Sequence, residues 1–185
     1  MRKLTLIMTA SVDGYVVKPD GMPVGAMPEP PELKRWKLDR ISRAGTHAMG
    51  RKTYQEMSSF WPKSNDPYAT PMNDIPKVVF SKTLKVADWP ETTIATGNLA
   101  KEVAILRRKR GGEIIAWGGA SFAQSLSRAN LIDEYAIITR PVAYGNGKPL
   151  FLDLPVALEL KLLATTSFPS GHVLRLYAPA GRRNA

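Results

Sequence analysis

Short apolar runs alternate along this chain with segments of helical spacing, and this alternation restricts the architecture more than any other feature. Runs such as "LTLIMTA", "THAM" and "EIIAW" are followed, directly or after a loop, by segments with the apolar period of a helix. Parallel strands need crossover connections, usually helices, so the pattern indicates a parallel sheet with helices on both faces. Two late apolar segments joined by "FPSGH" indicate an antiparallel hairpin instead. We therefore expect a three-layer α/β/α fold with a mostly parallel central sheet and an antiparallel C-terminal hairpin.

The same spacing predicts where the elements lie. The expected strands cover residues 3–10, 46–49, 77–81, 92–95, 112–119, 132–143, 158–167 and 173–178. The expected helices cover residues 32–44, 51–57, 98–110 and 120–129, and Asn98 is the expected N-cap of the third. The connection "FWPKSNDPYATPMNDIP" contains four prolines and is expected to be irregular. We expect one domain over residues 1–180 and a disordered tail over residues 181–185.

Composition narrows the functional classes. A chain of 185 residues suits one domain, and no run approaches the 18 apolar residues of a membrane span. The early apolar stretch, Leu4 to Ala10, suits a buried first strand better than a signal peptide. The absence of cysteine excludes disulfides, thiolate metal sites and cysteine nucleophiles, and the two histidines have no metal-type spacing. We expect a cytoplasmic enzyme or binding protein without a metal and without a membrane partner.

The formal net charge of +10 raises the question of nucleic-acid binding. The densest cations, Arg107 to Arg110, close a predicted helix, where positive charge offsets the helix dipole. Arg182 and Arg183 lie in the expected tail, and the remaining cations are scattered. We therefore expect no nucleic-acid partner. Small anionic ligands, such as phosphorylated substrates and cofactors, account for the surplus charge.

Two predicted strand-to-helix junctions suit phosphate: Gly50-Arg51-Lys52-Thr53 and Gly118-Gly119-Ala120-Ser121. A helix N-terminus offers unpaired N–H groups and partial positive charge, and glycine lets a phosphate approach the backbone. Arg51 adds a planar fork and Thr53 a hydroxyl, while Ser81-Lys82 ends a third strand with another hydroxyl and cation. A single glycine of this kind is most often a turn residue. Three such strand ends together predict a dinucleotide at the carboxyl edge of the sheet.

These segments resemble a known superfamily. "AMGRKTYQEM" resembles the dihydrofolate reductase signature, "IAWGGASFAQSL" that family's later Gly-Gly segment, and "IPKVVFSKTL" its strand ending in a serine that contacts the 2′-phosphate. "LTLIMTASVDGYVVKPDG" and "LIDEYAIITRPVAYGNGKPLF" are more similar to the related reductase domain of bifunctional riboflavin-biosynthesis proteins. The similarity runs in order over about residues 3–178.

The resemblance implies a dihydrofolate reductase-like fold that binds NADPH. By position, Arg51, Ser81 and Lys82 would hold the 2′-phosphate. The other implied cofactor-binding residues belong to the two glycine junctions and would adjoin the pyrophosphate: Gly50, Thr53, Gly118, Gly119, Ala120 and Ser121. The Gly-Gly peptide is cis in the relatives, so we expect a cis bond between Gly118 and Gly119. The loop from residue 11 to residue 20 would border the nicotinamide.

The catalytic candidates are Asp13 and Glu32. Dihydrofolate reductases carry a carboxylate early in the first long helix, where this chain has Glu32 and, nearly two turns later, Asp39. Either also suits a surface or helix-dipole acid. Asp13 would lie beside the nicotinamide and orient the substrate or relay a proton, and it equally suits an Asp-Gly turn. The implied substrate-binding residues are Ser11, Asp13 and Gly14.

The resemblance implies a reductase of 5-amino-6-(5-phosphoribosylamino)uracil, which is a small heterocyclic substrate of riboflavin biosynthesis. It also implies a homodimer paired through the sheet edge and the C-terminal strands. Reduction of dihydrofolate or another pterin is one alternative, and an NADPH-binding module without catalysis is another. The deaminase of that pathway needs a zinc site with cysteines, which this chain does not have.

Overall fold

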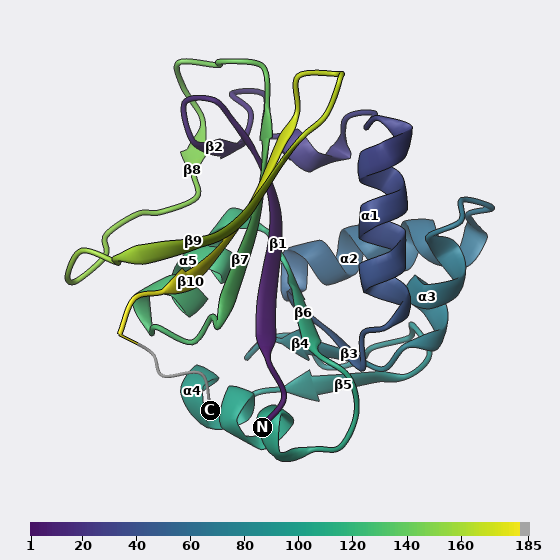
Figure 1. The fold of residues 1–185 in the computed structure, drawn as a ribbon. Helices are drawn as coiled ribbons and strands as arrows, with labels where there is room; N and C mark the ends of the chain where they lie inside the picture. The colour runs from purple at the N-terminus through teal and green to yellow at the C-terminus, as the bar shows by residue number, and fades with distance from the viewer. Residues whose placement is uncertain (182–185) are drawn as a thin grey trace.

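The computed structural model describes residues 1–181, and the ends of its helices and strands agree closely with the sequence pattern (Figure 1). The described strands are β1 (Leu4–Ser11), β2 (Tyr15–Val17), β3 (Thr46–Gly50), β4 (Lys77–Phe80), β5 (Thr92–Ala95), β6 (Ile114–Trp117), β7 (Glu134–Arg140), β8 (Lys148–Pro149), β9 (Leu160–Ser167) and β10 (Val173–Pro179). The α-helices are α1 (Pro31–Ser42), α2 (Arg51–Phe60), α3 (Ala69–Asp74), α4 (Leu99–Arg108) and α5 (Ala120–Arg128). Two short 3₁₀ turns are η1 (Val24–Ala26) and η2 (Trp61–Lys63).

The central sheet has the order β5-β4-β3-β6-β1-β7-β10-β9. The six strands at one side of this order, β5, β4, β3, β6, β1 and β7, are parallel to one another. Strand β10 runs antiparallel to both β7 and β9. The prediction of a mostly parallel sheet with an antiparallel C-terminal hairpin is confirmed.

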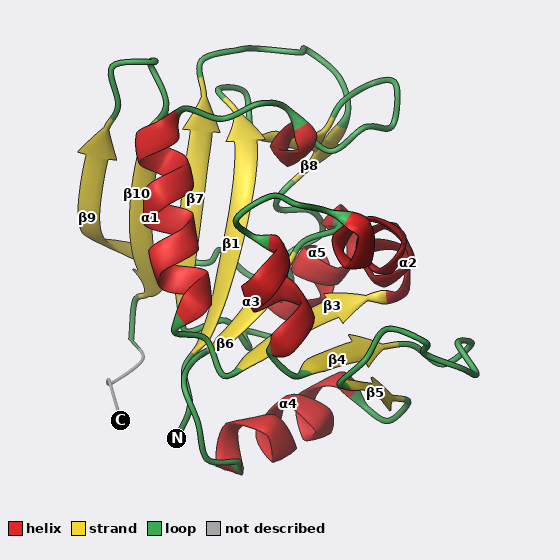
Figure 2. Ribbon diagram, turned by 90° about the vertical axis from the view of Figure 1, so that its right-hand side faces the viewer, coloured by secondary structure: helices red, strands yellow, loops and turns green. Residues whose placement is uncertain are grey.

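Helices cover both faces of the sheet, which gives the predicted three layers (Figure 2). On one face Ile7 of β1 packs in a cluster with Leu33 of α1 and with side chains of α2 and α3. On the other face Leu6, the adjacent residue of β1, packs with Leu126 of α5 and with side chains of α4. Successive strand residues point to opposite faces, so β1 is buried along its whole length.

The sequence predictions were incomplete in two places. The proline-rich connection is not irregular throughout, because it contains η2 and α3. Proline fits the first turn of a helix, where its missing N–H has no intrahelical partner, and Pro62 and Pro71 lie in such first turns. The short strands β2 and β8 were also not predicted; they pair with each other in a separate two-stranded sheet. The predicted tail lies, apart from residue 181, outside the described residues.

A buried ionic network ties α1 to the amino end of the sheet. Arg40 of α1 donates from Nε and Nη2 to the two carboxylate oxygens of Glu113, each at 2.8 Å. Its Nη2 also lies 2.5 Å from Glu134 Oε1, and Lys3 pairs with the same carboxylate. The Arg40 side chain is 15% exposed. The network leaves the carboxyl end of the sheet free for the site described below.

None of the helices within residues 1–181 is long and apolar enough to cross a lipid bilayer.

Candidate functional site

The two glycine-containing junctions lie against each other at the carboxyl edge of the sheet. Strands β3 and β6 are parallel neighbours, so the helices that follow them, α2 and α5, begin side by side (Figure 2). A Cβ atom on Gly50 would lie 3.2 Å from Cβ of Phe122 in α5. A Cβ atom on Gly119 would lie 3.0 Å from the Thr53 hydroxyl oxygen in α2. The structure therefore joins the two segments that the sequence selected separately.

The first turns of α2 and α5 leave backbone N–H groups available. Within residues 1–181, neither Gly50 nor Gly119 has a side-chain partner that caps its helix, and neither first turn contains an acidic residue. Helix α4 differs, because the Asn98 side chain accepts hydrogen bonds from the N–H groups of Ala100 and Lys101. Free N–H groups and the helix dipole both favour an anion. The paired starts of α2 and α5 can therefore hold a phosphate or a pyrophosphate.

Close packing explains the glycines at this edge better than backbone conformation does. The φ angles of Gly50 and Gly119, −82° and −91°, are open to every residue type. A Cβ atom on Gly118 would collide with the side-chain methyl of Met8. A Cβ atom on Gly119 would project into the space beside Thr53, with no other atom within 4 Å. Gly119 thus keeps open the space between the two helix starts.

The expected cis bond between Gly118 and Gly119 is wrong, since the described residues contain no cis peptide bond. A trans bond is the favoured form wherever the next residue is not proline. The extended backbone of Gly119, with φ −91° and ψ 150°, leads the trans chain from β6 into α5. The cis bond was implied by the resemblance alone, and no residue of this chain requires it.

The Arg51 side chain reaches the turn that follows β4. Its Nη1 donates a hydrogen bond of 2.9 Å to the Thr83 hydroxyl. The Ser81 hydroxyl oxygen in turn accepts hydrogen bonds from the backbone N–H groups of Thr83 and Leu84, at 3.2 and 2.9 Å. Lys82 lies between them and is exposed. The predicted 2′-phosphate residues are therefore brought together. Thr83 joins this group, and its position directly after Ser81 and Lys82 in the sequence could have suggested it.

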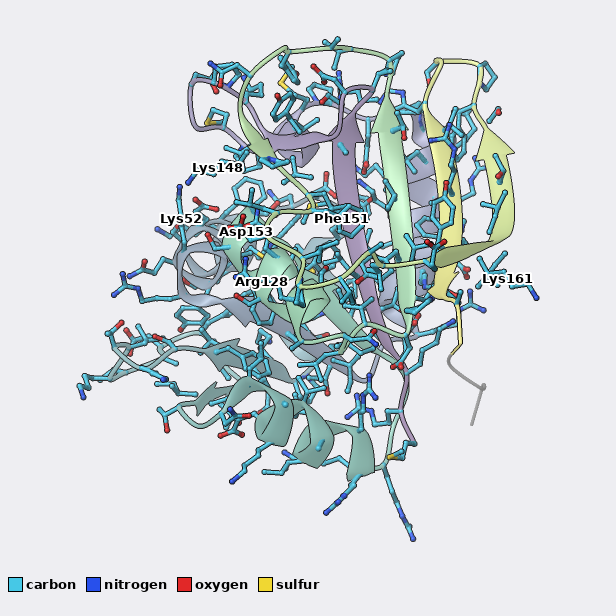
Figure 3. All side chains as sticks on the ribbon, turned by 90° about the vertical axis from the view of Figure 1, so that its left-hand side faces the viewer. Lys52, Arg128, Lys148, Phe151, Asp153 and Lys161 are labelled. Atoms are coloured by element: carbon cyan, nitrogen blue, oxygen red, sulfur yellow. The ribbon has the colours of Figure 1, made fainter. Side chains whose placement is uncertain are left out.

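Lys52, the second residue of α2, projects outward from the same edge of the molecule (Figure 3). Its Nζ lies 3.9 Å from a Glu56 oxygen one turn later. It adds positive charge near the junction without being committed to a close hydrogen bond.

Asp13 connects the loop after β1 to the loop after β7. The Ser11 hydroxyl donates to Asp13 Oδ1 at 2.5 Å, and the N–H groups of Tyr144 and Gly145 donate to Oδ2 at 3.0 and 2.7 Å. The hydrogen bonds from Ser11 and then from Gly145 hold the pKa of Asp13 below its ordinary value. Gly14, with φ at +86°, makes the turn that follows. An ionised carboxylate with these partners holds the loop in place.

The two acids weighed on α1 are Glu32 and Asp39, and both are exposed. Glu32 is exposed in the first turn of the helix, where a negative charge complements the dipole. Asp39 is exposed and pairs with Arg43 one turn later. Neither lines the small pocket between α1 and the carboxyl end of β1.

A shallow pocket, too closely packed to hold a water molecule, lies next to the carboxyl end of β1. Its walls come from β1, the segment around η1, α1, the end of β7 and the start of β10, and its lining residues are Thr9, Val24, Gly25, Met27, Glu29, Leu33, Lys37, Arg140 and His172. Sequence reasoning selected none of these. Thr9 lies two residues before Ser11 and Leu33 directly follows Glu32, and both Ser11 and Glu32 are predicted site residues.

The ionisable groups of the pocket are mostly committed to one another. Glu29 pairs with Lys37 and accepts a hydrogen bond of 2.5 Å from the Tyr68 hydroxyl. Burial, followed by the hydrogen bond to Glu29, raises the pKa of Tyr68, so Tyr68 remains a proton donor. Arg140 Nη1 donates to the Pro28 carbonyl at 2.8 Å. Burial and then the Arg140 charge lower the pKa of His172, which favours a neutral imidazole.

Three comparisons with known proteins bear on the family and the fold of this chain. A family model described as the RibD C-terminal domain matches residues 2–174. The protein YyaP of Bacillus subtilis (strain 168), described as uncharacterized, is 28% identical over 181 residues, which covers 95% of this chain and 94% of that protein.

Two solved structures share the fold. A putative riboflavin biosynthesis protein from Shewanella sp. PV-4 superposes with a TM-score of 0.79 at 23% identity, covering 98% of this chain and 99% of that one. A dihydrofolate reductase from Enterococcus faecalis, complexed with NADP(H) and RAB-propyl, has a TM-score of 0.65 at 17% identity and covers 96% of both chains. At these identities the likeness establishes the fold and no more.

Proposed function

This chain belongs to the RibD C-terminal domain family, and on that premise we propose that it is an NADPH-dependent reductase of 5-amino-6-(5-phosphoribosylamino)uracil or a closely similar ribosylaminopyrimidine. The family and the Shewanella neighbour, which is named for riboflavin biosynthesis, support the substrate class. The neighbour that was solved with NADP(H) supports the cofactor.

One observation carries the cofactor assignment: the uncapped starts of α2 and α5 meet at Gly119 and Thr53, on the same helix as Arg51. A pyrophosphate between the two helix starts would receive N–H donors from both. Arg51 and the hydroxyls of Ser81 and Thr83 would then lie at the end that carries the 2′-phosphate. Two helix starts and a separate cluster of one cation and two hydroxyls suit a ligand with several phosphates better than a single phosphate.

Bound NADPH would supply a hydride. The hydride would add to the sugar carbon of the open-chain imine and a proton to its nitrogen, which gives the ribitylamino product. The protein would contribute mainly by holding the two reactants in contact and by excluding water. Asp13 keeps its role as a candidate for orienting the substrate, because its fixed carboxylate lies at the end of β1. The exposure of Glu32 makes it the weaker catalytic candidate.

The test is NADPH oxidation by the purified protein, followed as the loss of NADPH absorbance, with the ribosylaminopyrimidine or dihydrofolate as the second substrate. The proposal expects turnover with the pyrimidine and none with dihydrofolate. Turnover with dihydrofolate alone would contradict the proposal and indicate a pterin reductase. Tight NADPH binding without turnover of either compound would indicate a binding module.

A further inference from the structure

A cationic surface lies at the end of the sheet opposite to the glycine junctions. Helix α4 follows β5 and returns past the strands, so its last turn lies near the start of β1 (Figure 1). The Arg2 backbone N–H donates to the Arg107 carbonyl at 3.0 Å, which joins the two segments. The structure therefore adds Arg2 to the basic run at the end of α4, residues 107–110.

These residues surround an open hollow of ≈560 Å³. Its lining within residues 1–181 consists of Met1, Arg2, Arg107, Arg108, Lys109, Arg110 and Gly111. The volume lies within the range of small-molecule sites. Every ionisable side chain of this described lining is basic, so the hollow suits an anion.

The Arg2 guanidinium is held in place by uncharged groups. Its Nε donates to the Gly112 carbonyl at 2.6 Å, and its Nη2 donates to the Thr46 hydroxyl at 2.8 Å. A Cβ atom on Gly111 would lie 3.9 Å from Arg2 Cζ, so the guanidinium lies against the turn that leads to β6. Arg2 is thus positioned by the chain while its charge is not balanced by these partners.

Most of the other cations of the hollow are also unbalanced. Arg107 is the exception, because its Nη2 donates to an Asp133 carboxylate oxygen at 2.7 Å. The lining cations that form no ion pair with a carboxylate within residues 1–181 are Arg2, Arg108, Lys109 and Arg110. The last three are exposed and consecutive in the sequence.

The dipole of α4 accounts for only part of this charge. The carboxyl end of a helix carries about half a negative charge, which is less than the charge of one of these side chains. Cations on consecutive residues repel one another, and physiological salt screens that repulsion only partly at short range. A ligand with several negative charges would offset the repulsion.

We propose that this hollow is a second anion site and that it binds linked phosphates, either free or as the triphosphate group of a nucleotide. Guanidinium groups present paired N–H donors that match phosphate oxygens, and Lys109 adds a further positive charge. Adjoining phosphates can meet successive cations, whereas a single phosphate can meet only some of them. The hollow lies where β1 and β6 begin, and the proposed cofactor edge lies where β3 and β6 end, so the two sites are separate.

Isothermal titration calorimetry with tripolyphosphate, ATP and orthophosphate, each without divalent cations, tests the site. Tripolyphosphate should bind at least roughly tenfold more tightly than orthophosphate. Saturating NADPH should leave this affinity unchanged, because the cofactor edge lies at the other end of the strands. Equal affinities for ATP and tripolyphosphate would identify the linked phosphates as the recognised group, and tighter binding of ATP would identify a nucleotide. Both results support the site.

Two double variants and a matched control locate the binding. Arg108→Gln with Arg110→Gln removes two cations of the hollow and should weaken tripolyphosphate binding at least roughly tenfold. Arg108→Lys with Arg110→Lys retains the charge and should recover part of the affinity. Lys63→Gln with Lys101→Gln removes the same charge from exposed positions outside the hollow and should change the affinity little. Circular dichroism should be the same for all variants, because the four side chains are exposed.

Several results would overturn the inference. Absence of tripolyphosphate binding would do so, and so would equal affinity in the wild type and the Arg108→Gln, Arg110→Gln variant. Displacement of tripolyphosphate by NADPH would place it at the cofactor edge instead. An equal loss in the lysine control would show a response to net charge alone. Binding of a single-stranded oligonucleotide without binding of tripolyphosphate or ATP would indicate a nucleic-acid surface. The proposed function is tested separately by NADPH oxidation, and none of these results decides it.

Discussion

Trp117 Nε1 donates a hydrogen bond of 3.1 Å to His47 Nδ1, which joins the two strands that lead into the glycine junctions. Trp117 directly precedes Gly118, and His47 lies three residues before Gly50. An indole N–H only donates, so Nδ1 accepts and the imidazole proton is on Nε2. Nε2 then donates to the Pro71 carbonyl at 3.0 Å. The bond from Trp117 requires a neutral His47, because protonation would place a hydrogen on Nδ1.

Acid should therefore destabilise the folded protein through His47. Burial lowers the pKa of His47 from 6.5 to about 4, and the nearby Lys77 charge adds to this while the Pro71 carbonyl opposes it. Between pH 6.5 and pH 4 the unfolded chain binds a proton at His47 more tightly than the folded protein does. The contribution of a neutral His47 to the free energy of unfolding is therefore fully present above pH 6.5 and is lost as the pH falls towards 4. The expected loss is about 3 kcal/mol. Urea unfolding followed by tryptophan fluorescence at several pH values would measure it.

The His47→Gln variant provides the control, because glutamine does not titrate. Carboxylates also lose stabilising interactions in acid, and they do so equally in both proteins. The difference in unfolding free energy between wild type and variant should shrink as the pH falls from 6.5 to 4. A constant difference would show that His47 does not carry this pH dependence.

Gly119→Val should abolish NADPH binding and leave much of the fold intact. The new side chain would enter the space beside Thr53, where the pyrophosphate is proposed to lie. The backbone angles of Gly119 are open to valine, so little backbone strain is expected. Circular dichroism would report folding, and calorimetric titration would report affinity. A folded variant with normal NADPH affinity would remove this junction from the cofactor site.

Arg51→Ala should weaken NADPH binding far more than NADH binding. Arg51 lies next to Thr83 and the Ser81 turn, and a hydrogen bond to a charged phosphate contributes roughly 1.5–3 kcal/mol. That range corresponds to a loss of roughly ten- to a hundredfold in NADPH affinity. Lys52→Ala is the matched control, since Lys52 projects outward and should change affinity much less (Figure 3). Equal dissociation constants of the wild-type protein for NADPH and NADH would contradict the assignment.

Arg40→Met should destabilise the fold by about 3 kcal/mol, because the partly buried Glu113 would lose its cation and the buried Glu134 would keep only Lys3. Arg43→Met at the C-cap of that helix should cost less than about 0.5 kcal/mol, since its pair with Asp39 is exposed. Chemical unfolding of the two variants measures both values. Similar losses in the two would show that helix propensity, and not the buried network, sets the effect.

We propose that the protein is a homodimer paired through β9. This edge strand is exposed along nearly its whole length, and Leu162 and Leu163 are 51% and 49% exposed. An exposed apolar edge strand is open to pairing with another chain. Light scattering should give twice the chain mass, and Leu162→Glu should give a monomer. Lys161→Glu is the control on the same strand, where Lys161 points outward (Figure 3). A monomeric wild type at micromolar concentration would rule out this dimer.

Local patterns in the sequence were sufficient for the fold and for selecting the segments that meet at the proposed cofactor edge. Apolar period and crossover spacing predicted the layers, and Asn98 marked the start of α4 because its cap is made within three residues. Arg51, Ser81 and the Gly118-Gly119 pair could be selected because each lies where a strand ends, and parallel strands end at one edge.

Tertiary structure alone brought together the residues of the pocket beside α1. Glu29, Arg140 and His172 come from three separate segments, and the carboxylate on α1 that the sequence favoured, Glu32, proved to be exposed. Sequence patterns report the environment of a residue along its own helix or strand, whereas a pocket depends on which side chains of different elements face one another. The pairing of His47 with Trp117 depends on the alignment of β3 with β6, which no residue of either strand specifies by itself.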